Sequence, residues 1–379
     1  MLNLSVDCLD NRFSPTKKHK GEAMIATAQR LANVIQAIFL AADSNQDEAS
    51  AIAENLIEAN LTGHDSHGIG MVPRYVERVL RGAINVNQHA TVTHQSGPVV
   101  QVDGNLGYGQ VIGAETLDIG IEKTRETGAT IIALRNSHHL GRIGAWGEKC
   151  ADAGFVSIHF VNAIGLSPQV APYGGVEGRY STNPYCTSIP STSEQPRIVL
   201  DMATSKVAMG KVLVARNRGE EIADGVLLDP EGFPTNNPDV MFGNPRGALV
   251  PFGDHKGYGL SFICEVLAGA LINGGTCVPR NQVQNTAINN MLSIILDPNA
   301  LGDSEVFRKE LDEITAYVKS ARPAEGVDEV MVPGDPERAA KAKRQESGIS
   351  VDDETWRQVL GAANSVGLRS SDIDQLIAA

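Results

Sequence analysis

The sequence predicts an α/β protein in which both ends of the chain form one helical domain beside a central α/β domain. Both ends show apolar residues at helical spacing, whereas the middle alternates short apolar runs with helical patterns. A length of 379 residues is more than one hydrophobic core usually organises. We expect a discontinuous helical domain from residues 24–84 and 301–379, a central domain from 85–300, and a flexible tail over 1–23.

The helices of the two chain ends are predicted from apolar spacing and from start and stop signals. They are expected over residues 25–42, 44–61, 71–81 and 304–320, and within 335–379. Ser44 precedes the second pattern as a helix-capping residue, and Gly82 follows the third where glycine commonly ends a helix.

The central region is predicted to contain a sheet with helices between its strands. Strands are expected at 91–93, 99–102, 130–134, 155–161, 197–200 and 293–297, and helices at 110–128, 144–153 and 258–271. Residues 210–244 are rich in Gly, Pro, Asn and Asp, so we expect surface loops there.

The composition argues against several kinds of partner. Lys and Arg number 32 against 45 Asp and Glu, and this net charge of −13 repels nucleic acids unless basic residues gather on one face, which they do not. The longest apolar stretch, 262–272, is too short to span a membrane and contains Glu265. Five dispersed cysteines and a polar start without a secretory signal favour a reducing, cytoplasmic location.

Five of the nine histidines lie in glycine-rich segments, where a ligand can approach the backbone closely. The first segment, 63–70, contains His64, Asp65, Ser66 and His67. A hydroxyl or carboxylate next to a histidine can fix its tautomer, so that the ring protonates a substrate oxygen. The residues alone equally allow Asp65 and Ser66 to cap a helix beside solvated histidines.

Three further segments carry polar residues that could bind a ligand. Residues 136–144, with His138 and His139, follow a strand and open a helix, where free amides can bind an anion such as pyrophosphate. Asp201 ends a later strand, as an acid that binds a ribose hydroxyl does. Residues 251–260 place His255 and Lys256 before an apolar helix. Each segment alone is also explained by ordinary loop and turn chemistry.

Two nucleotide-binding fingerprints are missing from the sequence. The stretch 107–113 comes nearest to G-x-G-x-x-G, but it has one residue too many before its last glycine. No G-x-x-x-x-G-K-[ST] loop occurs either. A Rossmann-type dinucleotide site and a P-loop are therefore not expected.

Taken together, these segments resemble the malate/L-lactate dehydrogenase family of type 2. This family comprises non-Rossmann NAD(P)-dependent 2-oxoacid/2-hydroxyacid oxidoreductases, including ureidoglycolate and diketogulonate dehydrogenases. Six motifs occur in the family's order, at residues 63–68, 137–142, 171–175, 182–184, 201–205 and 255–260, with a weaker echo at 332–334. The run 69–75 looks like the hydroxycarboxylate dehydrogenase branch.

The resemblance implies a non-Rossmann malate/L-lactate dehydrogenase-type fold and a homodimer. It also implies hydride transfer between NAD or NADP, with NAD slightly preferred, and carbon 2 of a small 2-oxo or 2-hydroxy acid, without a metal. His67 would be the acid/base with Ser66 beside it, and His139 is the alternative proton donor. Thr182 would lie near the substrate, and Lys211 is a possible orienting residue. The cofactor-binding residues implied are His139, Leu140, Gly141, Arg142, Ile143, Asp201, Met202 and Ala203.

The sequence departs from the family pattern at two positions. Many members carry an arginine that would bind the substrate carboxylate where this chain has Met71, and Leu140 replaces an aromatic residue. A thioether has no positive charge, so another cation must bind the carboxylate. Arg74 and Arg142 are the candidates, followed by Lys256.

Two other functions are open at this point. A metal-dependent hydrolase would use His64, Asp65 and His67 together with His138 or His139, although their spacing is not that of a typical zinc site. A catalytically inactive nucleotide-binding homologue would explain Met71.

Overall fold

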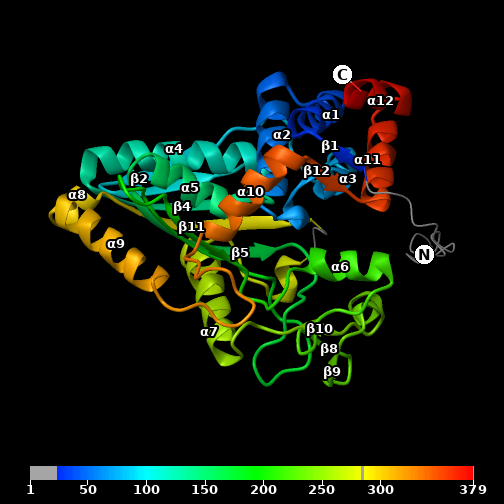
Figure 1. Ribbon diagram of the computed structural model, residues 1–379. Coiled ribbons are helices and arrows are strands. Elements are labelled where there is room, and N and C mark those ends of the chain that lie inside the picture. Colours follow the sequence, from blue (N-terminus) through cyan, green and yellow to red (C-terminus); the bar gives the residue numbers. More distant parts are fainter. Residues whose placement is uncertain (1–23, 283–285, 379) are drawn as a thin grey trace.

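The computed structural model describes residues 24–282 and 286–378, so the predicted tail 1–23 lies outside the described residues. Helices from both ends of the chain gather in one part of the molecule (Figure 1). They are α1 (Ala28–Ala41), α2 (Gln46–Leu61), α3 (Val72–Leu80), α10 (Asp335–Ser347), α11 (Asp353–Ser365) and α12 (Ser370–Ala378). The short 3₁₀ helices η1 (Asp65–His67) and η2 (Ile69–Met71) link α2 to α3.

A two-stranded antiparallel sheet joins the two chain ends, because β1 (Met24–Ala26) pairs with β12 (Ile349–Val351). The helix predicted over 25–42 therefore begins later than expected, at Ala28. Thr27 caps it by accepting a hydrogen bond from the backbone N–H of Arg30 at 3.3 Å. Tertiary strand pairing has overridden the helical pattern at its first residues.

The centre of the molecule is a seven-stranded sheet in the order β2-β3-β4-β11-β5-β6-β7. Its strands are β2 (Thr91–Ser96), β3 (Val99–Asp103), β4 (Ala129–His138), β5 (Val156–Ile164), β6 (Tyr185–Ile189), β7 (Ile198–Met202) and β11 (Ile288–Leu296). β3 and β4 are parallel, and the other neighbours in this sheet are antiparallel. The prediction of a mixed α/β protein is confirmed.

Helices cover both faces of this sheet (Figure 1). On one face lie α4 (Gly109–Thr127) and α5 (Gly144–Asp152), close to their predicted bounds. On the other lie α7 (His255–Cys264), its π-helical continuation η4 (Glu265–Leu271), and α9 (Ser304–Lys319), which follows the short α8 (Pro298–Leu301).

Two expectations for the region after β5 were wrong. Strand β6 was not predicted, and residues 210–244 are not all loop, because α6 (Met209–Arg218) occupies their start. Its residues before Gly219 are mostly good helix formers, and Gly219 ends the helix at φ +65°. Beyond it lie the small strands β8 (Leu227–Leu228), β9 (Pro234–Thr235) and β10 (Ala248–Leu249), with the 3₁₀ helices η3 (Pro238–Phe242) and η5 (Pro279–Asn281).

Buried apolar side chains form three clusters. One joins α1, α2 and α3 to α11 and α12, a second lies between the sheet and α4 and α5, and a third joins α6 to β8 and β10. Helix α9 lies under the sheet rather than with the helices of the chain ends (Figure 1). The division at residues 84 and 301 stays a prediction. No helix in the described ranges is long and apolar enough to cross a membrane.

Candidate active site

The segment predicted to carry the acid/base forms a tight loop between α2 and α3. The side-chain amide of Asn60, at the end of α2, holds this loop together. Its Oδ1 accepts from the backbone N–H of Ile69 at 2.8 Å, and its Nδ2 donates to Asp65 Oδ1 at 2.7 Å. A Cβ on Gly68 would overlap the same amide, so this position requires glycine.

Ser66 orients the ring of His67. Ser66 Oγ lies 3.0 Å from His67 Nδ1, whereas Nε2 has no hydrogen-bond partner among the described residues. Burial, and then the nearby His64 and Arg142, lower the pKa of His67 to about 4. His67 is therefore neutral near pH 7 in the free protein.

Asp65, the carboxylate that could have fixed a histidine tautomer, is occupied elsewhere. Arg344 of α10 donates to both of its oxygens, at 2.6 and 2.9 Å, and also to the backbone carbonyl of Asn60. Glu337 of the same helix lies 3.4 Å from His64 Nε2. Helix α10 therefore holds the loop that carries His67 in place. The contact to the His67 ring from within this loop comes from Ser66 and not from Asp65.

His139 lies against His67, with ring centroids 5.6 Å apart and 17° between the ring planes. Strand β4 ends at His138 and so brings His139 to the loop after α2. Tyr75 Oη lies 2.7 Å from His139 Nδ1 and accepts from Gln110 Nε2 at 3.0 Å. Burial, and then His67, hold the pKa of His139 well below its usual value. Both candidate proton donors thus meet in one site.

His138 is a core residue rather than part of this pair. Its ring is fully buried, its Nε2 lies 3.1 Å from Thr286 Oγ1 and 3.4 Å from an Arg78 nitrogen, and burial lowers its pKa to about 3. Within residues 24–282 and 286–378, no three His, Cys, Asp or Glu side chains come together as a metal-binding group. The hydrolase alternative has no ligand set there.

The predicted cofactor loop, 139–143, is held in place by main-chain contacts. Leu140 N donates to Asn289 Oδ1 at 2.9 Å, and Leu140 O accepts from Trp146 Nε1 at 3.0 Å. The Leu140 side chain is fully buried, so it belongs to the core. Gly141 has φ +71°, which only glycine adopts freely.

Asp201 lies on β7 and binds the first residue of α5. Its Oδ2 accepts from Gly144 N at 2.7 Å, and burial raises its pKa against the opposing effects of Arg142 and this hydrogen bond. At the start of α5, where free amides were expected to bind an anion, the amide of Gly144 thus already binds a carboxylate of the protein. Asp201 Oδ1 keeps no partner among the described residues, and Met202 and Ala203 follow it, half-buried.

The two arginines proposed to bind a carboxylate differ in their surroundings. Arg142 is 3% exposed, and its Nη2 donates to Glu148 Oε2 at 2.5 Å. Arg74 is exposed and has no carboxylate within ion-pair distance in the described chain. Met71 is buried in the helical cluster, where a thioether fits well.

The remaining predicted residues come from segments near this site. Gly210, at the start of α6, is so close to Ser66 that a Cβ there would lie 2.6 Å from Ser66 Cβ, which brings the neighbouring Lys211 to the loop of His67. The backbone carbonyl of Thr182 accepts from Thr204 N and Oγ1 at 2.9 and 2.8 Å. Lys256 lies at the exposed start of α7, with no ion-pair partner in the described residues.

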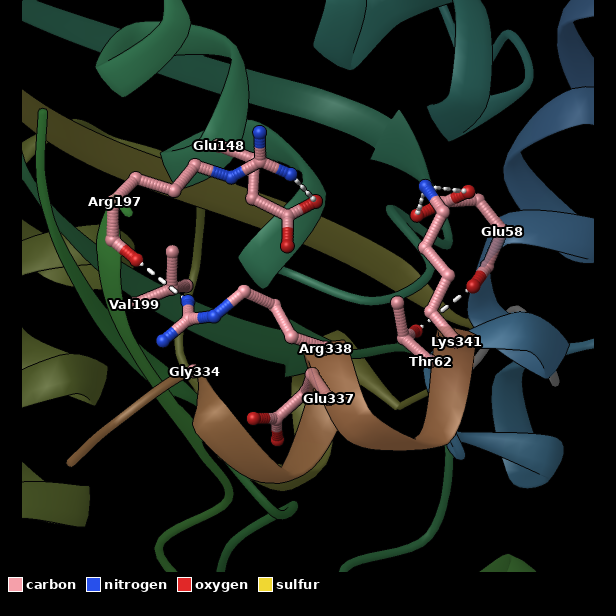
Figure 2. Close-up of a pocket in the computed structure, with 9 residues that line it drawn as sticks. All are labelled: Glu58, Thr62, Glu148, Arg197, Val199, Gly334, Glu337, Arg338 and Lys341. Carbon is pink, nitrogen blue, oxygen red and sulfur yellow. Dashed lines mark hydrogen bonds and ion pairs between the residues drawn. The ribbon is translucent and has the colours of Figure 1, made fainter. Parts of the chain in front are cut away.

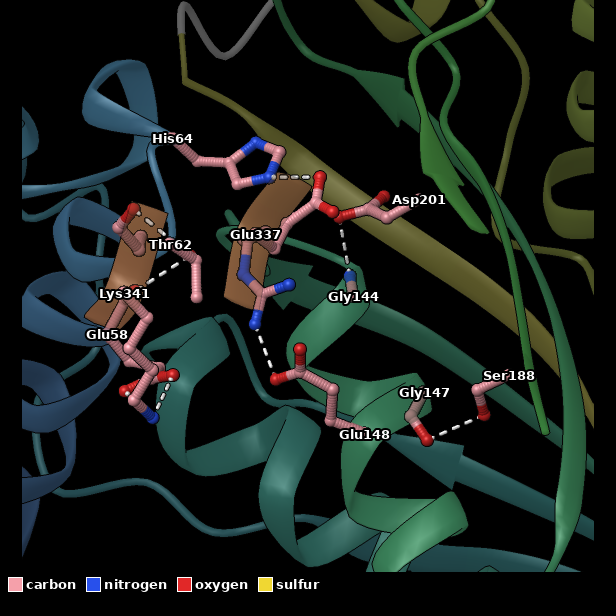
Figure 3. Close-up of polar contacts among 12 residues, drawn as sticks. Glu58, Thr62, His64, Gly144, Gly147, Glu148, Ser188, Asp201, Glu337 and Lys341 are labelled. Atoms are coloured by element: carbon pink, nitrogen blue, oxygen red, sulfur yellow. Dashed lines mark hydrogen bonds and ion pairs between the residues drawn. The ribbon is translucent and has the colours of Figure 1, made fainter. Parts of the chain in front are cut away.

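A pocket lies next to the predicted cofactor loop, between α2, α5, β7 and α10 (Figure 2). It is lined by Glu58, Thr62, Glu148, Arg197, Val199, Gly334, Glu337, Arg338 and Lys341. Figure 3 shows how Glu337 reaches His64 and how Asp201 reaches Gly144 beside this pocket.

Several of these residues were not predicted to belong to the site. Tyr75, Gln110 and Arg344 contact it from helices whose sequence showed only core or surface patterns. For Tyr75 a signal was present, because it follows Arg74 in a run that resembles one branch of the family. Arg344 gave none, since a basic residue in a charged helix is usually solvated.

Comparison with known proteins places this geometry in a family. The model of the malate/L-lactate dehydrogenase family matches residues 26–360. Hydroxycarboxylate dehydrogenase B of Escherichia coli K12 is 41% identical over 344 residues, covering 90% of this chain and 94% of its own. L-lactate dehydrogenase of Cupriavidus necator is 37% identical over 322 residues, covering 85% and 92%.

A solved structure agrees with these relatives. Sulfolactate dehydrogenase of Methanocaldococcus jannaschii superposes with a TM-score of 0.79 at 30% identity, covering 92% of this chain and 99% of its own. The predicted resemblance is thus confirmed along most of the chain, and the protein belongs to the malate/L-lactate dehydrogenase family.

Proposed function

We propose that the protein transfers a hydride between a nicotinamide nucleotide and carbon 2 of a small 2-oxo or 2-hydroxy acid. One observation carries this proposal: the ring of His67 stacks on that of His139, the first residue of the loop 139–143, with ring centroids 5.6 Å apart. Membership of a family whose relatives are named hydroxycarboxylate and lactate dehydrogenases supports the reaction class.

The residues beside the two histidines fit a nicotinamide nucleotide. Buried polar atoms of the described residues that lack a protein partner include Asn55 Oδ1, Gln110 Oε1 and Arg142 Nε, which offer both acceptors and a donor. A Cβ on Gly141 would meet Asn55 Oδ1 at 2.8 Å and Gln110 Nε2 at 3.4 Å, so two of these side chains border the loop. Asp201 Oδ1 is an acceptor suited to a ribose hydroxyl.

The bound nucleotide would supply the hydride in reduction and accept it in oxidation, and the chain exchanges the proton and provides the electrostatic environment. In the oxidation direction, neutral His67 accepts the hydroxyl proton at Nε2 while Ser66 holds Nδ1. In the reduction direction His67 must first be charged. An anionic substrate in this half-buried site favours the charged ring and raises the pKa of His67 from about 4, so acid catalysis is coupled to substrate binding.

The test is turnover of 2-oxo acids, followed by the absorbance of NADH at 340 nm. We expect His67→Ala to lower kcat about 10²- to 10⁴-fold, the usual contribution of a positioned acid, with nearly unchanged nucleotide affinity. His94→Ala, on the exposed face of β2, is the control. Nucleotide binding without turnover on any acid would instead identify an inactive homologue. Activity that survives in His67→Ala and disappears in His139→Ala would reverse the two roles.

We further propose that NAD is preferred over NADP. The cations of the adjoining pocket are already paired: Lys341 with Glu58 at 2.7 Å, Arg197 with Asp152 at 2.7 Å, and Arg338 with Asp335. A 2′-phosphate would meet the pocket carboxylates without a free cation.

Steady-state kinetics with both nucleotides tests this preference. We expect kcat/KM for NADH to exceed that for NADPH at least about tenfold, or roughly 1.4 kcal/mol. Glu337→Gln should narrow the ratio because it removes one pocket carboxylate, whereas Glu313→Gln, on the exposed face of α9, should not. Equal or better turnover with NADPH would contradict the proposal.

A homodimer is proposed from the resemblance and from exposed apolar side chains on one side of the sheet. Phe262 and Ile263 of α7 and Ile314 and Tyr317 of α9 are 44–76% exposed, an apolar surface typical of an association site. Light scattering should give twice the mass of the chain, and Tyr317→Asp should reduce the measured mass to that of a single chain.

Four cysteines of the described chain are free thiols, which supports the proposed cytoplasmic location.

A further inference from the structure

We propose that Tyr75 is a positioning residue that locks His139 in one tautomer, with its proton on Nε2. This inference rests on the proposed function for its role in turnover. The tautomer itself follows from the hydrogen bonds around Tyr75 and can be measured without any substrate.

The hydroxyl of Tyr75 has two hydrogen-bond partners. Gln110 Nε2 donates to it at 3.0 Å, and His139 Nδ1 lies 2.7 Å away. A phenolic hydroxyl has one proton, and no other described acceptor is within reach of it. A buried hydroxyl proton without an acceptor is costly, so this proton points at His139 Nδ1.

Both side chains are in the protonation state that this arrangement needs. Tyr75 is fully buried, and burial raises its pKa above its usual value, so the phenol keeps its proton. Burial and His67 lower the pKa of His139, so its ring carries one proton. Because Nδ1 accepts from Tyr75, that proton resides on Nε2.

The consequence for catalysis is a fixed donor. His139 Nε2 has no partner among the described residues, and the ring is half-buried beside His67. A neutral Nε2–H can donate a hydrogen bond to the oxygen on carbon 2 of the substrate, where negative charge develops during reduction. His67 then transfers the proton, so the two stacked histidines have separate tasks.

The experiment compares Tyr75→Phe with Tyr108→Phe. Tyr108 lies in the same buried aromatic group, with its ring centroid 6.1 Å from that of Tyr75, but the hydroxyl bonded to His139 is that of Tyr75 and not that of Tyr108. Both variants lose one buried hydroxyl and keep the ring, so they share any general cost to the core. Only Tyr75→Phe frees His139 Nδ1.

Nitrogen NMR of protein labelled at histidine, assigned with His139→Gln, reports the tautomer. We expect unprotonated Nδ1 in the wild type and in Tyr108→Phe, and a mixture of tautomers in Tyr75→Phe. With NADH and a 2-oxo acid, kcat of Tyr75→Phe should fall on the order of tenfold, which corresponds to the loss of about one hydrogen bond. The affinity for nucleotide should not change. Tyr108→Phe should keep wild-type kcat.

Four outcomes separate the possibilities. A protonated Nδ1 in the wild type, or an unchanged tautomer in Tyr75→Phe, overturns the inference. An unchanged kcat in Tyr75→Phe with a changed tautomer overturns its catalytic part. A wild type with the expected tautomer and no turnover refutes the proposed function and leaves the assignment of Tyr75 supported.

Discussion

Arg74 and Arg142 differ at the level of single residues, and this difference predicts which one binds the substrate carboxylate. Arg142 already donates to Glu148, whereas Arg74 is exposed, unpaired in the described chain and adjacent to Tyr75. We expect Arg74→Lys to raise the KM for the acid at least about tenfold, roughly 1.4 kcal/mol, because an ammonium cannot form the bidentate contact of a guanidinium.

Arg142→Lys is the matched comparison for that measurement. It should change the KM for nucleotide or the stability, because Arg142 is a buried member of the predicted cofactor loop and is paired with Glu148. A KM for the acid that rises with Arg142→Lys and not with Arg74→Lys would contradict this assignment. If neither variant changes it, Lys256 and then Lys211 are the cations to replace.

At this scale the sequence identified residues by their motifs but not their partners. His67 and Ser66 are neighbours in the chain, so their contact could be expected. The stacking of His139 on His67, and the bonds from Tyr75 and Arg344, join residues that are far apart in sequence. Nothing in local spacing predicts such pairs, because the fold sets them.

Among the elements, helix α10 has the clearest expected effect on activity. Arg344 holds Asp65, and so the loop of His67, from this helix. We expect Arg344→Gln to lower kcat severalfold, because the loop that carries His67 loses a tie. The stability should change little, by about 1 kcal/mol or less, since the pair is partly solvated.

The control for Arg344→Gln is Arg308→Gln, which breaks an ion pair with Glu305 on α9, away from the site. Urea unfolding and kcat should be measured on both variants. If Arg344→Gln and Arg308→Gln reduce kcat equally, α10 has no specific role in positioning His67.

The elements themselves were predicted best where caps and periodicity agree. Helices α2 and α4 begin and end within two residues of their expected bounds, although Asn45 rather than the expected Ser44 caps α2; Gly128 ends α4 at φ +78°. Strand β6 was missed because it follows the Thr182–Pro184 motif, which has the composition of a turn, and is only five residues long. Residues 24–26 form strand β1 instead of the start of the predicted helix, because they pair with β12, which lies far along the chain.

For the molecule as a whole, buried histidines predict loss of stability in mild acid. Burial lowers the pKa of His138 and of His159 to about 3 from 6.5. The unfolded chain therefore binds more protons between pH 3 and 6.5, and stability that is present above pH 6.5 is lost as the pH falls through that window. Between pH 7 and 5 each histidine should cost on the order of 2 kcal/mol.

Urea unfolding at pH 7 and pH 5 checks this expectation. His159 bridges Ser293 Oγ and Ser157 Oγ at 2.7 and 2.8 Å in the sheet, so His159→Gln lowers stability at both values. The informative quantity is the difference between pH 7 and 5, which should shrink in His159→Gln and stay as in the wild type in His94→Gln, on the exposed face of β2. An equal difference in all three proteins would show that His159 titrates normally.

The pairing of β1 with β12 affects the order in which parts of the chain can fold during synthesis on the ribosome. The strands of the seven-stranded sheet lie within residues 91–296, so their contacts can form while the C-terminal helices are still being made. The partner of β1 emerges only at Ile349–Val351, and Arg344 shortly before it. The loop of His67 is therefore completed last, and a chain halted before residue 344 would have a formed sheet but would lack the contact that holds this loop.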